Sequence, residues 1–454
     1  MPAPICLSPA PTRRQFLAST AALGLSACGG GGGGAGPAPG PVIESLTAAP
    51  VAVGDAAQIT PTFSGGAGRI EPDIGAVRSG VAVLTPPLAG PRRYTLIVEA
   101  AGQAAACREL EVVPRYRDRY LAIATPQPLQ YHAAVTAADG GVIVIGGSRG
   151  LSTMSEAIDR FDPATRTFTR IGSMASGRAQ HTATALAQDR ALVLGGLVGL
   201  SAAGFAELVD LRSGAVEPAG WPMRPRMRHA AVALDDGRVL VVGGLQSNSV
   251  ELWDPATRRF RLVAERMNNV REYPSATRLT DGRVLIVGGD HTGPSQRLAE
   301  IFDPRTERFE PVASPLDGER RAMHAAHALA DGRVLVLGGE LRTDTGLEPL
   351  DSVLLFDPAT QTLAPHGHLD APRSLVRSLL LPDGQVRLFG GQTAAEAAAR
   401  SASAYAPGAA GRTLAAMPAG RAWRTVSALA DGRVLILGGD NEAGQPVGNA
   451  LLYE

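Results

Sequence analysis

The chain is poor in cysteine. Only three cysteines, Cys6, Cys28 and Cys107, occur in 454 residues, so the sequence offers no disulfide framework of the kind that holds small secreted domains together. No nearby residue would stabilise a thiolate at Cys107, and we expect it to be a small apolar strand residue rather than a reactive thiol.

Net charge and long helical patterns are missing as well. Lys and Arg together number 43, as do Asp and Glu, so the charge balance does not favour nucleic acid as a partner. Few stretches carry apolar residues at helical spacing, whereas 54 glycines and 34 prolines separate short apolar runs. This pattern predicts an all-β protein of many short strands, with several domains or one large repetitive domain.

The first residues resemble a bacterial export signal. Residues 12–17, Thr-Arg-Arg-Gln-Phe-Leu, resemble the twin-arginine motif, and the apolar run 16–27 is too short to span a bilayer. Residues 25–28, Leu-Ser-Ala-Cys, resemble a lipobox, which implies cleavage before Cys28 and a lipid on its sulfur. We expect residues 1–28 to be a signal peptide and the protein to be lipid-anchored in the cell envelope, in the outer membrane or facing the periplasm. The alternative is an ordinary secretory signal and a soluble periplasmic protein.

Two short regions follow the signal. Residues 29–41 are rich in glycine and proline, which predicts a flexible tether with a stiffer end. Residues 42–114 contain alternating runs of strand length between Gly and Pro clusters, which predicts a small β-sandwich. The runs at 81–86 and 93–98 resemble immunoglobulin-like modules of bacterial surface lipoproteins. That resemblance implies a spacer or adhesive role.

The rest of the chain repeats one phrase, for example Asp-Gly-Arg-Val-Leu-Ile-Val-Gly-Gly at 281–289. Its Asp-Gly pair predicts a tight turn, its four apolar residues a strand buried on both faces, and its two glycines a stop in backbone conformations that other residues resist. A period of 45 to 52 residues with four short strands predicts seven blades of a β-propeller. The doublets begin at Gly146, Gly195, Gly243, Gly288, Gly338, Gly390 and Gly438.

The four strands of one copy can be placed around Gly243. Strands a to d are expected at 230–234, 238–242, 249–253 and 260–263, with small residues in strand a because blades converge on an axis. Between strands c and d, an aromatic residue followed by Asp-Pro-x-Thr recurs in four copies. Together these residues resemble the kelch family over 117–454, which implies a seven-bladed kelch propeller like the central domain of galactose oxidase.

The ends of the repeat region predict how the ring closes. The last copy stops at residues 451–454, which align with strand c, so its strand d is missing. Residues 118–124 precede the first strand a and have the pattern of a strand d. We expect residues 117–127 to pair with the C-terminal strand, because an open ring would leave unpaired strand edges.

One face of the propeller is expected to bind a ligand. Its b-to-c and d-to-a connections vary in length, whereas the turns of the other face are uniform. An arginine stands seventeen residues before six of the doublets, and four copies carry a histidine at the position three residues later. Because these residues repeat, we expect them to bond inter-blade backbone. Departures from the repeat are the candidate ligand-binding residues: Tyr273, Asp290, His291, Glu340, Arg342, Gln392, Trp423, Asp440 and Asn441.

The resemblance to galactose oxidase does not extend to its cofactor. That copper radical site needs a tyrosine joined to a cysteine, and residues 117–454 contain no cysteine. His324 and His327 face opposite sides of a strand, and His366 and His368 lack another ligand, so we expect no metal and no cofactor. The sequence therefore predicts a monomer that binds a carbohydrate or a protein. The alternative is a cofactor-independent lyase or isomerase acting on a sugar, with unknown catalytic residues.

Overall fold

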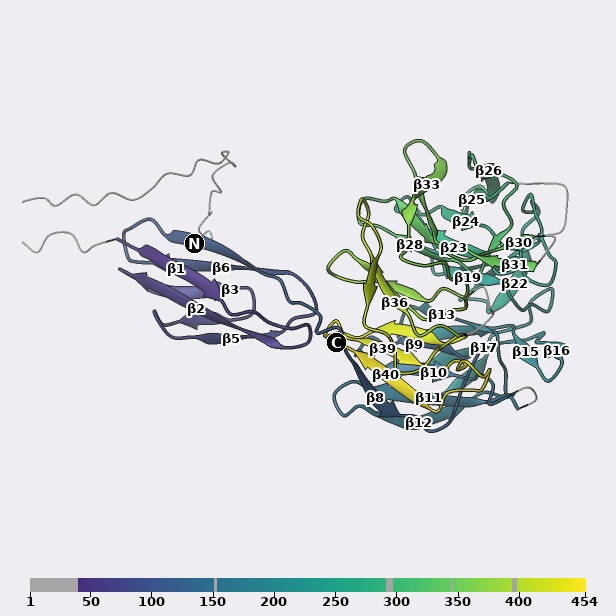
Figure 1. Cartoon of the computed structure of the whole chain (residues 1–454), viewed down its shortest axis with the longest axis horizontal. Helices are drawn as coiled ribbons and strands as arrows, with labels where there is room; N and C mark the ends of the chain where they lie inside the picture. Colours follow the sequence, from purple (N-terminus) through teal and green to yellow (C-terminus); the bar gives the residue numbers. More distant parts are fainter. Residues whose placement is uncertain (1–39, 151–152, 291–296, 344–345, 394–397) are drawn as a thin grey trace, which may run out of the picture. The chain divides into compact units, whose positions relative to one another are not determined.

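A computed structural model describes residues 40–150, 153–290, 297–343, 346–393 and 398–454. These residues form strands and no helix, so the described part holds no helix that could cross a membrane. The all-β class is confirmed (Figure 1). The chain divides into two compact units, the first ending at Arg115 and the second covering Tyr116–Glu454. The twin-arginine motif and Cys28 lie outside the described residues.

The first unit packs two antiparallel sheets, β1-β2-β5 and β4-β3-β6-β7, on one core. Alternate residues of β2, such as Ile59 and Phe63, point into this core, as expected for a half-exposed strand. Cys107 lies in a strand, β7, as expected, but it is exposed and disulfide-bonded, which corrects the expectation of a small apolar residue. The strands are β1 (Val42–Ala48), β2 (Ala56–Ser64), β3 (Ala67–Glu71), β4 (Gly75–Val77), β5 (Val83–Pro87), β6 (Arg92–Glu99) and β7 (Ala106–Val112).

The described part of the second unit contains seven four-stranded antiparallel sheets. From the innermost strand outward, the first four sheets are β9 (Ala133–Thr136), β10 (Val142–Ile145), β11 (Ala157–Asp162), β12 (Thr167–Ser173); β13 (Thr182–Leu186), β14 (Arg190–Leu194), β17 (Ala206–Asp210), β18 (Val216–Pro218); β19 (Ala230–Ala233), β20 (Val239–Val242), β21 (Val250–Asp254), β22 (Arg259–Leu262); and β23 (Ser275–Arg278), β24 (Val284–Val287), β25 (Ala299–Asp303), β26 (Arg308–Pro311).

The last three sheets are β28 (Ala325–Ala328), β29 (Val334–Leu337), β32 (Ser352–Asp357), β33 (Thr362–His368); β34 (Ser378–Leu380), β35 (Val386–Phe389), β36 (Ala402–Tyr405), β37 (Arg412–Leu414); and β38 (Thr425–Ala428), β39 (Val434–Leu437), β40 (Asn449–Tyr453), β8 (Tyr120–Ala124). Two hairpins decorate the b-to-c connections of the second and fifth sheets. They are formed by β15 (Leu197–Val198) with β16 (Ser201–Ala202), and by β30 (Glu340–Thr343) with β31 (Gly346–Pro349), the latter extended by β27 (Arg321–Ala322).

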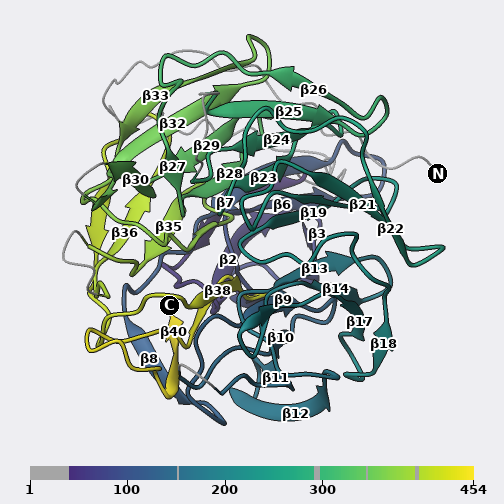
Figure 2. The ribbon, with the colours of Figure 1, turned by 90° about the vertical axis from the view of Figure 1, so that its right-hand side faces the viewer.

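The sheets form a closed ring around an axis (Figure 2). The innermost strand of each sheet lies beside that of the next, and β38 lies beside β9. The outer strand of the seventh sheet comes from the start of the unit, because β8 pairs with β40 through Leu121 opposite Leu452 and Ile123 opposite Ala450. First and last strands of the unit therefore share one sheet, and the ring has no open gap.

The glycine doublets lie where consecutive sheets contact each other. Gly243 and Gly244 have φ values of 70° and 82°, in the left-handed region that favours glycine. A Cβ on Gly243 would collide with the carbonyl oxygen of Arg271, which precedes the next sheet. The doublets thus end strand b and also allow the following sheet to pack against it.

Candidate functional site

Seven left-handed residues, one before the innermost strand of each sheet, surround the axis. Left-handed backbone is sparsely populated outside glycine and persists where the surroundings enforce it, so their side chains project from fixed positions. Backbone bonds link neighbours: Tyr131 N donates to Trp423 O (3.1 Å), and Tyr273 N donates to Arg228 O (2.8 Å). We name this set the axial ring. Its members, with φ between 51° and 60°, are Tyr131, Gln180, Arg228, Tyr273, Met323, Leu375 and Trp423.

Buried arginines hold the connections that carry the axial ring. Arg226 Nη1 donates to the carbonyl oxygen of Gly243 (2.7 Å), and its Nη2 lies 2.7 Å from Glu251 Oε1. Arg271 makes the equivalent ion pair with Glu300 at 3.0 Å, and neither side chain of that pair is exposed. The arginine side chains bond backbone and carboxylates of their own sheet. The expected inter-blade backbone bonds are made by the arginine carbonyl oxygens, as Gly244 N donates to Arg271 O at 2.8 Å.

Three of the four repeated histidines connect neighbouring sheets through side chains. In each pair the histidine Nε2 lies 2.8 or 2.9 Å from a hydroxyl of the preceding sheet. Burial lowers the pKa of His229 to about 3, so this imidazole is neutral at physiological pH. The histidines thus have a structural role. The pairs are His132 with Thr425, His229 with Thr182, and His324 with Ser275.

A cavity of about 140 Å³ lies at the axis and includes two predicted residues, Tyr273 and Trp423. The ring of Trp423 lies 4.5 Å from that of Tyr131 and 6.2 Å from that of Tyr273, between centroids. Tyr131 was missed by the sequence analysis, as was Arg228, whose guanidinium carbon lies 5.4 Å from the Tyr273 ring centre. Both occupy the position directly before the repeated histidine, which was the available signal. We name this space the axial cavity.

A second cavity of about 370 Å³, which we name the polar cavity, lies on the side of the third to fifth sheets. Asp290 accepts from Arg320 Nη2 through Oδ1 (2.7 Å) and lies 2.7 Å from Arg342 Nε through Oδ2. Glu272 pairs with Arg228 at 2.9 Å, so three guanidinium groups face two carboxylates. The predicted residues Asp290 and Arg342 therefore meet in one charged cavity. His291 lies outside the described residues.

The other predicted residues do not line the polar cavity. Glu340 is buried on β30 opposite Ala322, and Gln392 pairs through its backbone with Ser374. Asn441 Oδ1 accepts from the backbone nitrogens of Ala443 and Gln445, both at 3.0 Å, and so stabilises its own turn. Glu340 and Gln392 directly follow their glycine doublets, and Asn441 stands one residue further on.

Asp440 lies half-buried beside Gln130, and burial raises the pKa of its carboxyl to about 6. With the Gln130 amide oriented to donate, its nitrogen lies 2.6 Å from Asp440 Oδ2. That bond favours the charged carboxylate and so opposes the shift that burial causes.

Replacing Asp440 is expected to remove a pH dependence of stability. Because the folded pKa of Asp440 lies above its unfolded value of about 3.9, the folded state binds more protons between these two values. The free energy of unfolding of the natural protein relative to Asp440→Asn should therefore fall as pH rises from about 4 to about 6 and stay level above. Urea unfolding of both proteins across this pH range tests the prediction. If the free energies of unfolding of the two proteins change with pH in parallel, the raised pKa of Asp440 is contradicted.

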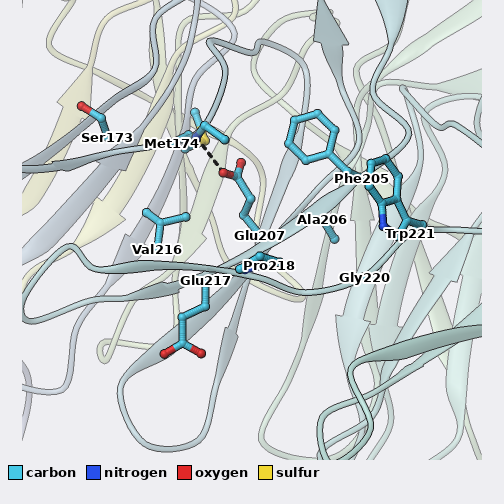
Figure 3. Close-up of a pocket in the computed structure, with 11 residues that line it drawn as sticks. Ser173, Met174, Phe205, Ala206, Glu207, Val216, Glu217, Pro218, Gly220 and Trp221 are labelled. Atoms are coloured by element: carbon cyan, nitrogen blue, oxygen red, sulfur yellow. Dashed lines mark hydrogen bonds between the residues drawn. The ribbon is translucent and has the colours of Figure 1, made fainter.

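A third cavity, of about 450 Å³, is mostly apolar and lies where the first and second sheets meet (Figure 3). Phe205 and Trp221 stand side by side there, with ring centroids 6.1 Å apart, and Trp221 is 73% exposed. Glu207 lies beside them and accepts from the backbone nitrogen of Ala175 (2.7 Å). No repeat signal marks these aromatic residues, because each occurs in one sheet only.

Comparison with known proteins agrees with this geometry. The Kelch motif family matches residues 131–175, which include the whole first sheet. The second unit is a β-propeller whose first sheet carries the Kelch motif, and we refer to it as the kelch propeller. A fungal alcohol oxidase with catalytic diversity among the AA5 family, solved in complex with copper, superposes on this chain with a TM-score of 0.60 and 15% identity, over 74% of this chain and 75% of that chain. Identity this low shows the shared fold alone. No curated protein matches the sequence.

The residues of the kelch propeller do not fit the copper of that oxidase. Within the described ranges, no group of three or more His, Cys, Asp or Glu side chains is placed to hold a metal ion. Axial histidines such as His229 and His324 already contact hydroxyl groups through Nε2. Cysteine is absent from residues 117–454. The described side chains therefore do not form a copper site.

Proposed function

We propose that the kelch propeller is a binding module that takes a carbohydrate in the polar cavity. The carrying observation is the Arg320–Asp290–Arg342 cluster, where one carboxylate holds two guanidinium groups at 2.7 Å. Such groups offer a hydroxyl-rich ligand both donors and acceptors in a fixed arrangement. The size of the cavity, about 370 Å³, suits a short saccharide.

The surroundings of the polar cavity support the same ligand class. Arg228 lines both the polar and the axial cavity, and it lies against Tyr273. Aromatic rings present flat apolar surface to the C–H faces of sugars while charged groups bind the hydroxyls. As part of this proposal, the protein is a lipid-anchored component of the cell envelope, and its first unit is an immunoglobulin-like spacer.

A glycan array followed by calorimetry tests the binding proposal. Asp290→Ala and Arg342→Ala should each weaken binding of a glycan hit about 10- to 100-fold, because each removes a charged hydrogen-bonding group from the cavity. Asp331→Ala is the matched control, since Asp331 forms a 2.7 Å pair with Arg333 at an a-to-b turn, on the other face. The proposal would be contradicted if the array found no glycan that binds. It would also be contradicted if Asp290→Ala, Arg342→Ala and Asp331→Ala bound the glycan with equal affinity.

Asp440 favours a second candidate, a cofactor-independent lyase or isomerase. A carboxyl whose pKa is raised to about 6 is suited to exchange a proton near neutral pH. Incubating each bound glycan with the protein and measuring products by mass spectrometry separates the two functions. Turnover that Asp440→Asn abolishes supports the enzyme, whereas binding without turnover supports the module.

A further inference from the structure

The interface between the sixth and seventh sheets departs from the repeat. At three other interfaces a histidine directly follows the axial-ring residue and bonds to a hydroxyl group of the preceding sheet, as His229 bonds to Thr182 at 2.9 Å. At the sixth-to-seventh interface these two positions hold Arg424 and Arg377. A histidine and a hydroxyl form a hydrogen bond, but two guanidinium groups are donors only and repel each other.

Arg424 is buried with much of its hydrogen-bonding capacity unused. Its side chain is 1% exposed, and its Nη1 donates to the carbonyl oxygen of Leu375 at 2.9 Å. Its Nε and Nη2 have no hydrogen-bond partner within the described part of the chain. Burying a charged group without hydrogen-bond partners destabilises the folded state. Two nitrogen atoms of Arg424 therefore lack a hydrogen-bond acceptor among the described residues.

Arg377 and Arg424 both line the axial cavity, and none of the residues that line it is Asp or Glu. Its third arginine, Arg228, is already paired with Glu272 at 2.9 Å. Arg377 donates only to the backbone oxygen of Val376 at 3.3 Å among the bonds of the described residues. The cavity is thus positive, with no carboxylate of its own to balance the two arginines.

We propose that a small oxyanion binds in the axial cavity and is held by Arg377 and Arg424. Carboxylates and phosphates accept pairs of parallel N–H bonds from guanidinium groups, which matches the free Nε and Nη2 of Arg424. The cavity volume of about 140 Å³ equals the volume that about four or five water molecules occupy in the liquid. That volume suits acetate or inorganic phosphate. Anion binding in the axial cavity does not depend on carbohydrate binding in the polar cavity.

Calorimetry on the mature protein, dialysed free of oxyanions, tests this site with sodium acetate, sodium phosphate and sodium chloride at equal ionic strength. Saturable one-to-one binding of acetate or phosphate is expected, with chloride at least about tenfold weaker because it cannot accept a parallel pair of bonds. If only acetate binds, the ligand is a short organic acid. If only phosphate binds, the ligand is the inorganic ion. The proposal is overturned if neither acetate nor phosphate saturates the site, or if chloride binds as tightly as they do.

A variant that restores the repeat separates binding from structure. Arg377→Thr combined with Arg424→His supplies the histidine and hydroxyl found at other interfaces, so it should lose anion binding yet melt no lower than the natural protein in oxyanion-free buffer. Arg377→Met should also weaken binding at least about tenfold. Arg305→Met, at an exposed turn pair with Asp303, is the control and should bind normally. A double variant that melts lower, or binds as the natural protein does, overturns the proposal.

Discussion

Ile123→Asp is expected to destabilise the kelch propeller by about 4 kcal/mol or more. Ile123 on β8 is 7% exposed and packs in a core shared with Leu437 and Leu452 of the seventh sheet. The substitution loses apolar burial and places a carboxylate among apolar side chains. Urea unfolding followed by tryptophan fluorescence measures the loss, because Trp221, Trp253 and Trp423 all belong to the second unit.

The neighbouring variant Ala124→Asp is the control for the same strand. Ala124 is exposed on β8, so an aspartate there should cost less than about 1 kcal/mol. The comparison separates loss of the closing contact from the general effect of aspartate in a strand. Equal stability of the two variants would mean that β8 contributes little to the ring.

Arg271→Met is expected to cost about 3 to 5 kcal/mol of unfolding free energy. Neither Arg271 nor Glu300 is exposed, and the guanidinium also donates to the carbonyl oxygen of Leu298 at 3.2 Å. The variant leaves a buried carboxylate with fewer donors, since among the described residues only Asn268 still bonds to it. The same fluorescence-detected unfolding measures the loss.

Arg308→Met provides the exposed counterpart. Arg308 lies 3.5 Å from Glu265, and its side chain is 76% exposed, so solvent screens the pair and the change should cost less than about 1 kcal/mol. Adding Glu300→Leu to Arg271→Met should recover part of the loss, because it removes the uncompensated buried charge. A double variant less stable than Arg271→Met would show that Glu300 stabilises the ring without its partner.

The fold followed from local signals that repeat. Strand b around Gly243 was expected at 238–242, and β20 covers Val239–Val242. The doublets carry their own conformational requirement, so each strand end was visible in the sequence. The hairpin of β15 and β16 gave no such signal, because strands of two residues are too short to show alternation.

The site was harder to predict because it depends on how side chains meet across sheets. Asp290 and Arg342 were recognised as departures from the repeat, but their common partner Arg320 became evident only in three dimensions. Tyr131 was missed for another reason. Its left-handed backbone is enforced by the ring rather than signalled by glycine or asparagine, so residue type alone did not mark the position.

The pairing of β8 with β40 also sets an order of events during synthesis. β8 leaves the ribosome early, yet its partner strand ends at Tyr453 and is made last in this unit. Until then β8 has no neighbour, and the last gap between sheets stays open to solvent. The final step of folding therefore follows translation of the whole unit, and a prematurely terminated product keeps an edge available to other chains.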